Sequence, residues 1–164
     1  MRLLRVDQTL ELCESHLSST SAQGTEIEIL LTRSLLVLIC SEFEQAIESI
    51  IQERCSSIND IYLREFIGSC VDAVFRSVKS NEIAGLLNRF GKNYKETFKK
   101  KTDENPTAVT FYNNIVINRH SFAHAEGGNV TFMEVKKFYE EGHVVLDFFR
   151  DTLLVDNITV LSPK

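Results

Sequence analysis

Hydrophobic side chains recur along most of this chain with the period of an amphipathic helix. The first such helix is expected within residues 1–24, and its apolar members, spaced by three and four, are Leu3, Val6, Leu10, Cys13 and Leu17. The same period continues over residues 25–55, where a helix of about 30 residues would span roughly 45 Å. A third helix is expected over residues 58–78. The pattern therefore predicts an all-α bundle with the second helix as its spine.

Two pairs of polar residues mark the starts of long helices. Thr25 with Glu28, and Thr131 with Glu134, have the spacing of a capping box, in which each side chain satisfies a free backbone N–H at the helix start. The first pair opens the second helix. The second pair opens a last long helix, which the apolar pattern extends over residues 131–155.

Shorter helices are expected in the middle of the chain. One lies in NEIAGLLNRFG and ends at Gly91, and the basic segment after it is expected to be a polar connector with a helical turn or two. Asn105 suits an N-cap and Pro106 suits a first helical position, so another helix begins there. We expect about five to seven helices in all. The chain then divides into an N-terminal helix and linker (1–24), a helical domain (25–155) and a tail (156–164).

Composition and charge narrow the class of protein. The chain has 164 residues, of which 43% are hydrophobic and 25% charged, which suits one domain with a continuous core. A net charge of −5 argues against electrostatic coating of nucleic acid, although a local basic patch could hold a few phosphates. Four cysteines without a C-x-x-C pair, and no visible targeting signal, indicate reduced and mostly buried thiols in a cytoplasmic protein. No apolar run approaches the roughly 20 residues of a membrane span.

The segment INRHSFAHAEGG, residues 117–128, is the strongest candidate for chemistry. On a helix, His120 and His124 lie one turn apart on the same face, and Arg119 borders that face. The glycines would end the helix, whose partly negative C-terminal end favours a protonated imidazole. A histidine beside an arginine suits metal-free phosphodiester cleavage, because the imidazole exchanges a proton with the attacking or leaving oxygen and the guanidinium stabilises the phosphorane.

Two other interpretations of this segment stay open on the residues alone. Arginine and histidine are common at helix C-termini, where they compensate the dipole and bond to free carbonyls. Histidines at i and i+4 can also share a zinc ion. However, HSFAH lacks the internal glutamate of H-E-x-x-H, and a third ligand would have to come from Glu126 or His143.

An arginine, a polar residue and a histidine four to six residues after the arginine, at the end of a helix in an all-α domain, resemble the HEPN superfamily motif. Here they are Arg119, His120 and His124. LLNRFGKNYKETF before the motif, VTFMEVKKFYEEG after it and SEFEQAIESII in the second helix resemble the RiboL-PSP-type HEPN domains over roughly residues 25–155. The resemblance implies a homodimer, in which the motif helices of two protomers form a composite site.

The same resemblance implies a metal-independent ribonuclease without cofactor, often the toxin or effector of a prokaryotic toxin–antitoxin or antiphage system. Arg119 and His124 would be the catalytic pair, and His120 the supporting polar residue. HEPN toxins silenced by nucleotidylation carry a tyrosine two residues beyond the motif histidine, and Glu126 stands there instead. Since the family also contains inactive members, the alternative function is a silent adaptor that binds a partner protein or a nucleotide.

A basic run before the motif helix is the candidate RNA-binding surface. Residues 89–101 contain six basic side chains and one acidic one, whereas residues 1–80 sum to −5. On a helix, several of the lysines would share a face that could follow a phosphate backbone. They would equally suit an acidic antitoxin, and the alternative is a solvated connector. The candidates are Lys92, Lys95, Lys99 and Lys100.

Overall fold

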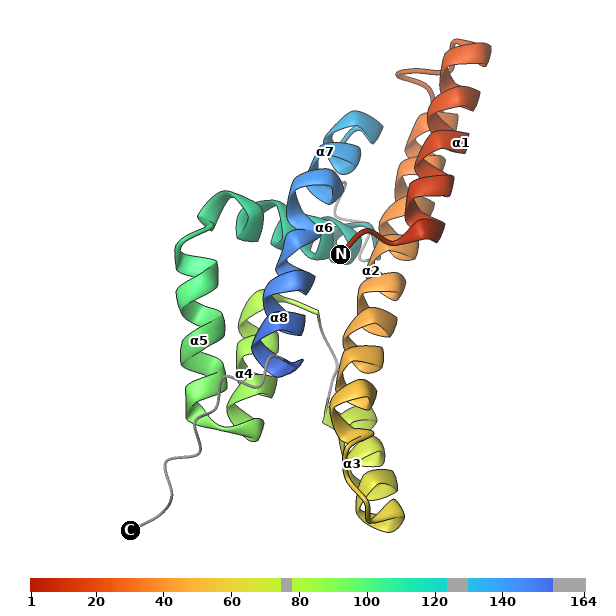
Figure 1. Cartoon of the computed structure of the whole chain (residues 1–164). Helices are drawn as coiled ribbons and strands as arrows, with labels where there is room; N and C mark the ends of the chain where they lie inside the picture. Colours follow the sequence, from red (N-terminus) through yellow and green to blue (C-terminus); the bar gives the residue numbers. More distant parts are fainter. Residues whose placement is uncertain (75–77, 124–129, 155–164) are drawn as a thin grey trace.

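The computed structural model describes residues 1–74, 78–123 and 130–154, and within these ranges the chain is helical with short connections (Figure 1). Its helices are α1 (Leu4–Thr20), α2 (Glu26–Cys55), α3 (Ile61–Val74), α4 (Ser80–Phe90), α5 (Lys92–Asp103), α6 (Pro106–Ala123), α7 (Phe132–Gly142) and α8 (Val144–Leu154). No strand occurs in these ranges. The all-α prediction is confirmed. None of the described helices is long and apolar enough to cross a membrane.

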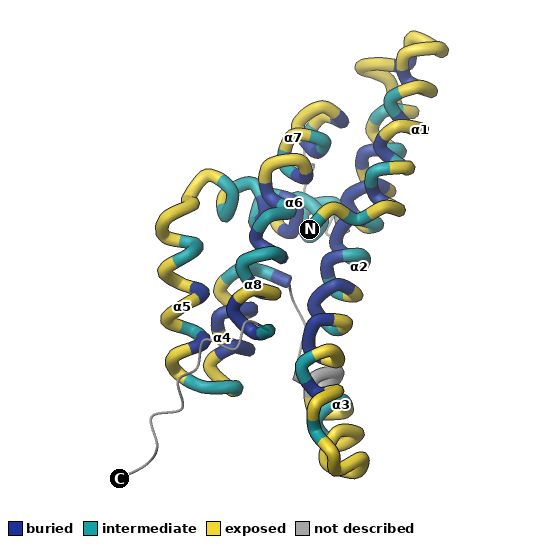
Figure 2. Tube along the Cα trace, in the orientation of Figure 1, coloured by how far each residue is buried: buried dark blue, intermediate teal, exposed yellow. Residues whose placement is uncertain are grey.

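The longest helix, α2, is the spine of the bundle, as its length predicted. It runs the height of the molecule, with α1 along its first half and α3 beside its last turns (Figure 1). Helices α6, α7 and α8 all pack against it, and its buried stripe faces these neighbours (Figure 2). The fully buried side chains of that stripe include Leu35, Leu36, Ile39, Phe43 and Ile47.

Aromatic rings join three helices at the centre of the core. Phe43 of α2 stacks on Tyr112 of α6, with ring centroids 4.8 Å apart and planes 8° apart. The same Phe43 ring lies 6.4 Å from that of Tyr139 in α7. All three side chains are fully buried, so they fix the relative positions of α2, α6 and α7.

Helix α1 buries the apolar face that its sequence predicted. Val6, Leu10, Cys13 and Leu17 are buried against the core, and Leu3 is half-buried. The four cysteines are free thiols and three of them are buried, which confirms their predicted state.

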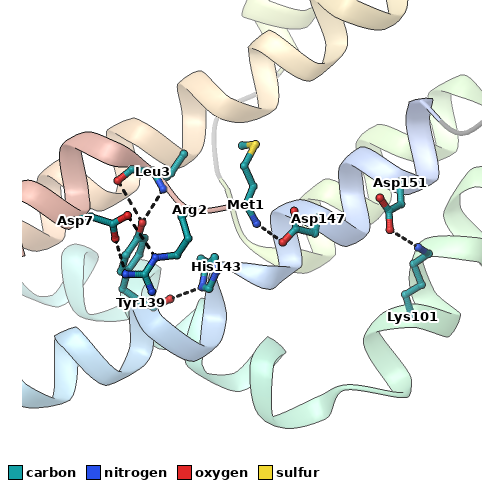
Figure 3. A network of polar contacts seen from close by, with 9 residues as sticks. All are labelled: Met1, Arg2, Leu3, Asp7, Lys101, Tyr139, His143, Asp147 and Asp151. Carbon is teal, nitrogen blue, oxygen red and sulfur yellow. Dashed lines mark hydrogen bonds and ion pairs between the residues drawn. The ribbon is translucent and has the colours of Figure 1, made fainter.

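The first residues of the chain are tied to the far end of the sequence (Figure 3). The Leu3 backbone N–H donates a 2.9 Å hydrogen bond to the Tyr139 hydroxyl. Arg2 pairs with Asp7 at 2.9 Å, and the Met1 amino group pairs with Asp147 of α8. The N-terminal segment thus closes over the junction of α7 and α8.

The prediction of one unbroken last helix is wrong, because the chain bends at His143 between α7 and α8. Helix α7 packs mainly on α6, whereas α8 packs on α2 and α5, so the two parts follow different neighbours. Gly142 makes the bend fit. A Cβ atom there would lie 2.6 Å from the backbone nitrogen of Tyr112, so α6 and the end of α7 approach more closely than any side chain would allow.

Of the two expected capping boxes, only the second forms. The Thr131 hydroxyl accepts from the Glu134 backbone N–H, and the Glu134 carboxylate accepts from that of Thr131. The Thr25–Glu28 box was wrong: the Thr25 hydroxyl donates to the Ala22 carbonyl oxygen instead. The Glu28 carboxylate is used elsewhere, since it accepts from the backbone N–H groups of Gly24 and Phe132.

The middle of the chain is more helical than its composition suggested. The basic segment expected as a connector forms α5, a helix of 12 residues. Helix α4 ends at Gly91, as predicted, with the glycine at φ 153°. Helix α3 begins later than expected, after Asp60, whose carboxylate accepts from the N–H groups of Tyr62 and Leu63.

Candidate active site

The last described turns of α6 position Arg119 and His120. Helix α6 begins at Pro106, as predicted, and the Asn105 side-chain amide donates to the Lys101 carbonyl oxygen at the end of α5. Near the middle of α6, Asn113 makes two hydrogen bonds to Ser80 of α4, of 3.1 and 2.9 Å. These contacts, together with the buried Tyr112, fix the direction in which the helix carries its C-terminal end to α2.

His124, Glu126 and the two glycines that follow lie outside the described residues. The proposed pairing of Arg119 with His124 therefore stays a prediction from the sequence. His120 is half-buried, and its side chain has an interaction partner.

Arg119 is half-buried against the middle of α2. Burial raises the pKa of the Cys40 thiol to about 12. The positive charge of Arg119 nearby lowers the same pKa, but by a smaller amount. Cys40 is therefore a neutral thiol. Among the described residues, no carboxylate forms an ion pair with the Arg119 guanidinium.

Tyr112 lies on the same face of α6 as Arg119, seven residues earlier. Its hydroxyl is buried and finds no hydrogen-bond partner among the described residues. Burial raises the pKa of Tyr112 well above its usual value, and the nearby Cys40 and Glu44 act in the same direction. The phenol therefore stays neutral. Helical spacing from Arg119 could have identified Tyr112, whereas nothing local indicates that Cys40 lies beside it.

A second arginine lies beside the end of α6. The Arg33 guanidinium carbon, from α2, is 4.9 Å from the centre of the Phe122 ring. Phe122 follows Arg119 by three residues, so the two lie on adjacent turns of the same helix. Arg33 and Phe122 are 89 positions apart in the sequence, and no local pattern predicts their contact.

His143 does not belong to this cluster. Its ring nitrogen Nδ1 lies 3.0 Å from the Tyr139 carbonyl oxygen, and it is drawn beside Arg2 and the Met1 segment in Figure 3. It is thus engaged at the bend between α7 and α8. In the part of the chain that the structure describes, no group of three His, Cys, Asp or Glu side chains could hold a metal ion, and His124 and Glu126 fall outside that part.

The candidate RNA-binding lysines all lie on α5, at the other end of α6 from Arg119. Lys92, Lys99 and Lys100 are exposed and Lys95 is half-buried, and Lys92 pairs with Glu96 at 3.4 Å. Arg119 follows Pro106 by 13 residues, which is roughly 20 Å along the helix axis. Figure 1 shows the same separation, with α5 on one side of the molecule and the end of α6 against α2. Within one protomer the lysines and Arg119 therefore form two separate surfaces.

Comparison with known proteins adds the family. The RiboL-PSP-HEPN family model matches residues 2–154, a range that includes every helix from α1 to α8. Neither the curated proteins nor the solved structures gave a significant match. The match covers almost the whole chain and agrees with the all-α bundle. The chain belongs to the RiboL-PSP-HEPN family.

Proposed function

We propose that this protein is a metal-independent endoribonuclease of the HEPN type. Membership of the family supports a nucleotide-related function in general terms. The narrower proposal is carried by Arg119, a half-buried cation at the end of α6 that has no ion-pair partner among the described residues. A permanent positive charge held in a partly desolvated position is suited to stabilising a phosphorane.

The proposed reaction uses the RNA's own nucleophile. The 2′-hydroxyl oxygen forms a bond to the adjacent phosphorus while the bond to the 5′-oxygen breaks. His124 exchanges the proton with the attacking or leaving oxygen, Arg119 stabilises the charge on the phosphorane, and His120 orients the phosphate or its partner side chain. The protein supplies no nucleophile of its own.

A second copy of the chain is proposed to complete the site. Leu30 and Val37, on the turns of α2 before and after Arg33, are 61% and 56% exposed, and Ile117 on α6 is 49% exposed. Groups of exposed apolar side chains mark interaction sites. A homodimer through this face would bring two motif ends together. The role of toxin or defence effector, with an acidic antitoxin or another defence protein as partner, is part of the proposal and rests on the family alone.

Cleavage of RNA in the presence of EDTA tests the function. We expect the purified protein to cleave RNA with EDTA present, Arg119→Ala to reduce the rate about 10²–10³-fold, and His124→Ala to reduce it about 10²–10⁴-fold. Arg5→Ala is the matched control, because Arg5 lies on α1 and pairs with Glu42 on another face of α2. It should cleave at the wild-type rate.

The other outcomes each favour another function. Cleavage that persists in both active-site variants would come from a contaminant and would reject the site. RNA binding without cleavage by the wild-type protein would indicate the adaptor. Activity that EDTA alone abolishes would indicate a metal enzyme.

A further inference from the structure

We propose that Arg33 is a phosphate-positioning residue, which binds an RNA backbone phosphate next to the one being cleaved. This inference rests on the proposed function, because it assigns a further residue to the same site. It follows from the contact between Arg33 and Phe122, in which the guanidinium carbon lies 4.9 Å from the centre of the ring.

Arg33 lies close to Arg119 through its contact with Phe122. Phe122 and Arg119 are three residues apart on α6, which is about 5 Å along the helix axis. Since Arg33 lies over the Phe122 ring, its guanidinium is held next to the turn that carries Arg119. Two cationic groups from two different helices therefore border the same end of α6, where a polyanionic chain could contact both.

The charge of Arg33 is not neutralised by a carboxylate among the described residues. The neighbours of Arg33 on its own helix at three and four residues, Ile29, Leu30, Leu36 and Val37, are all apolar. An acidic residue at one of these positions would form an ion pair with the arginine on the helix surface. Among the described residues no carboxylate pairs with Arg33, and Glu28 on the preceding turn is bound to the Gly24 and Phe132 backbone. An exposed arginine without a protein carboxylate is available to an external anion.

The Arg33 guanidinium carbon lies over the face of the Phe122 ring. A planar group that lies against an aromatic ring keeps the N–H donors at its edge free and loses side-chain freedom. Those donors can bind two phosphate oxygens at once, which a lysine ammonium cannot do in the same fixed orientation. The Phe122 ring is itself half-buried and packs on the core, so it gives Arg33 a fixed support.

Binding to an uncleavable RNA separates this role from catalysis. The probe is a single-stranded oligoribonucleotide with 2′-O-methyl groups, which removes the attacking hydroxyl, and affinity is measured over a series of salt concentrations. Arg33→Gln should weaken binding about tenfold and reduce the slope of log affinity against log salt by about 0.7, the value for one lost phosphate contact on a single strand. Arg33→Lys should keep the slope and lose part of the affinity.

A matched variant and a kinetic measurement exclude a merely structural effect. Arg5→Gln removes the same charge from α1 and should bind as the wild type does. With cleavable RNA, Arg33→Gln should raise KM about tenfold and leave kcat unchanged, because a positioning residue away from the reacting atoms contributes equally to ground and transition states. Circular dichroism melting of Arg33→Gln should match that of the wild type.

Three outcomes would overturn the inference: an unchanged salt slope and affinity in Arg33→Gln, an equal loss in Arg5→Gln, or no RNA binding by the wild type. Failure of the proposed function is distinguishable from these. Binding that depends on Arg33 in a protein that never cleaves RNA would support the Arg33 site and reject the nuclease. Cleavage that depends on Arg119 but not on Arg33 would do the reverse.

Discussion

At the scale of single residues, Gly142 shows how close packing sets what a position tolerates. The Cβ of an alanine there would lie 2.6 Å from the Tyr112 nitrogen and 2.9 Å from its Cα. Both atoms belong to the backbone of α6, so they cannot move aside as a flexible side chain would. The close approach of α6 and α7 therefore limits which side chain fits at position 142, and this limit does not depend on the chemistry of Arg119 and the histidines.

We therefore expect Gly142→Ala to destabilise the fold by about 1–3 kcal/mol, the usual cost of overpacking. Gly85→Ala is the control, because a Cβ at this exposed position in α4 meets no atom within 4 Å. It should stabilise the protein by up to about 1 kcal/mol through helix propensity. Urea unfolding measures both, and equal effects of the two substitutions would contradict the close contact.

His143 is expected to make stability depend on pH. Burial lowers the pKa of His143 below 6.5, and the positive charges of the Met1 amino group and Arg2 lower it further. The hydrogen bond to the Tyr139 carbonyl and the charge of Asp147 act in the opposite direction but do not cancel this effect. The folded state thus resists protonation more than the unfolded state does. The stabilisation is fully present above the unfolded pKa and is lost as the pH falls below it toward the folded value.

Chemical denaturation between pH 7.5 and 5.5 measures this dependence. His143→Gln should reduce the loss of stability in that range, because the neutral amide does not titrate. The matched control is His16→Gln, which replaces an exposed histidine of α1. A pH profile that is identical in wild type and His143→Gln would refute the assignment.

At the scale of helices, Thr25 and Thr131 have the same capping-box spacing in the sequence, but only Thr131 caps its helix. The Thr131 hydroxyl accepts from the Glu134 N–H at 3.3 Å, and hydrogen bonds from the Thr131 backbone and side chain lower the pKa of Glu134. Thr25 makes no such bond, since Glu28 is recruited to the start of α7. A local pattern cannot predict that recruitment, because it depends on a residue 104 positions away.

Thr131→Ala should therefore cost about 1 kcal/mol, the usual value of a lost N-cap. Thr25→Ala should cost clearly less, because no cap bond is removed. Thermal or urea unfolding of the two variants provides the comparison. Equal losses would mean that the first capping box forms in solution after all.

The helix starts and ends that could be predicted are those set by neighbouring residues. Pro106 begins α6, Gly91 ends α4, and Thr131 caps α7. The break at His143 could not be predicted, because the apolar period continues through it and only the different partners of α7 and α8 require a bend. Arg119 could likewise be identified from a local sequence motif, whereas Arg33 could be identified only from its contact with α6 in the folded structure.

At the scale of the whole molecule, the exposed Leu30 and Val37 of α2 predict a dimer. We expect sedimentation analysis to show a homodimer and a double variant, Leu30→Glu with Val37→Glu, to be monomeric. Because the proposed site needs two copies, the same variant should lose RNA cleavage while keeping its helical circular dichroism. Leu12→Glu is the control, since Leu12 is even more exposed, at 72%, but lies on α1. A monomeric wild type that cleaves RNA would contradict the composite site.

The hydrogen bond between Leu3 and Tyr139 also constrains how the chain can fold as it is synthesised. The two residues are 136 positions apart, and α2 likewise needs α6, α7 and α8 to cover its buried stripe. Contacts of such high sequence separation require loop closure before they contribute, which slows folding. A nascent chain on the ribosome therefore carries its two N-terminal helices with uncovered apolar surface until α7 and α8 have emerged. During translation this exposure favours chaperone binding, and the proposed nuclease can acquire activity only once α6, α7 and α8 have left the ribosome.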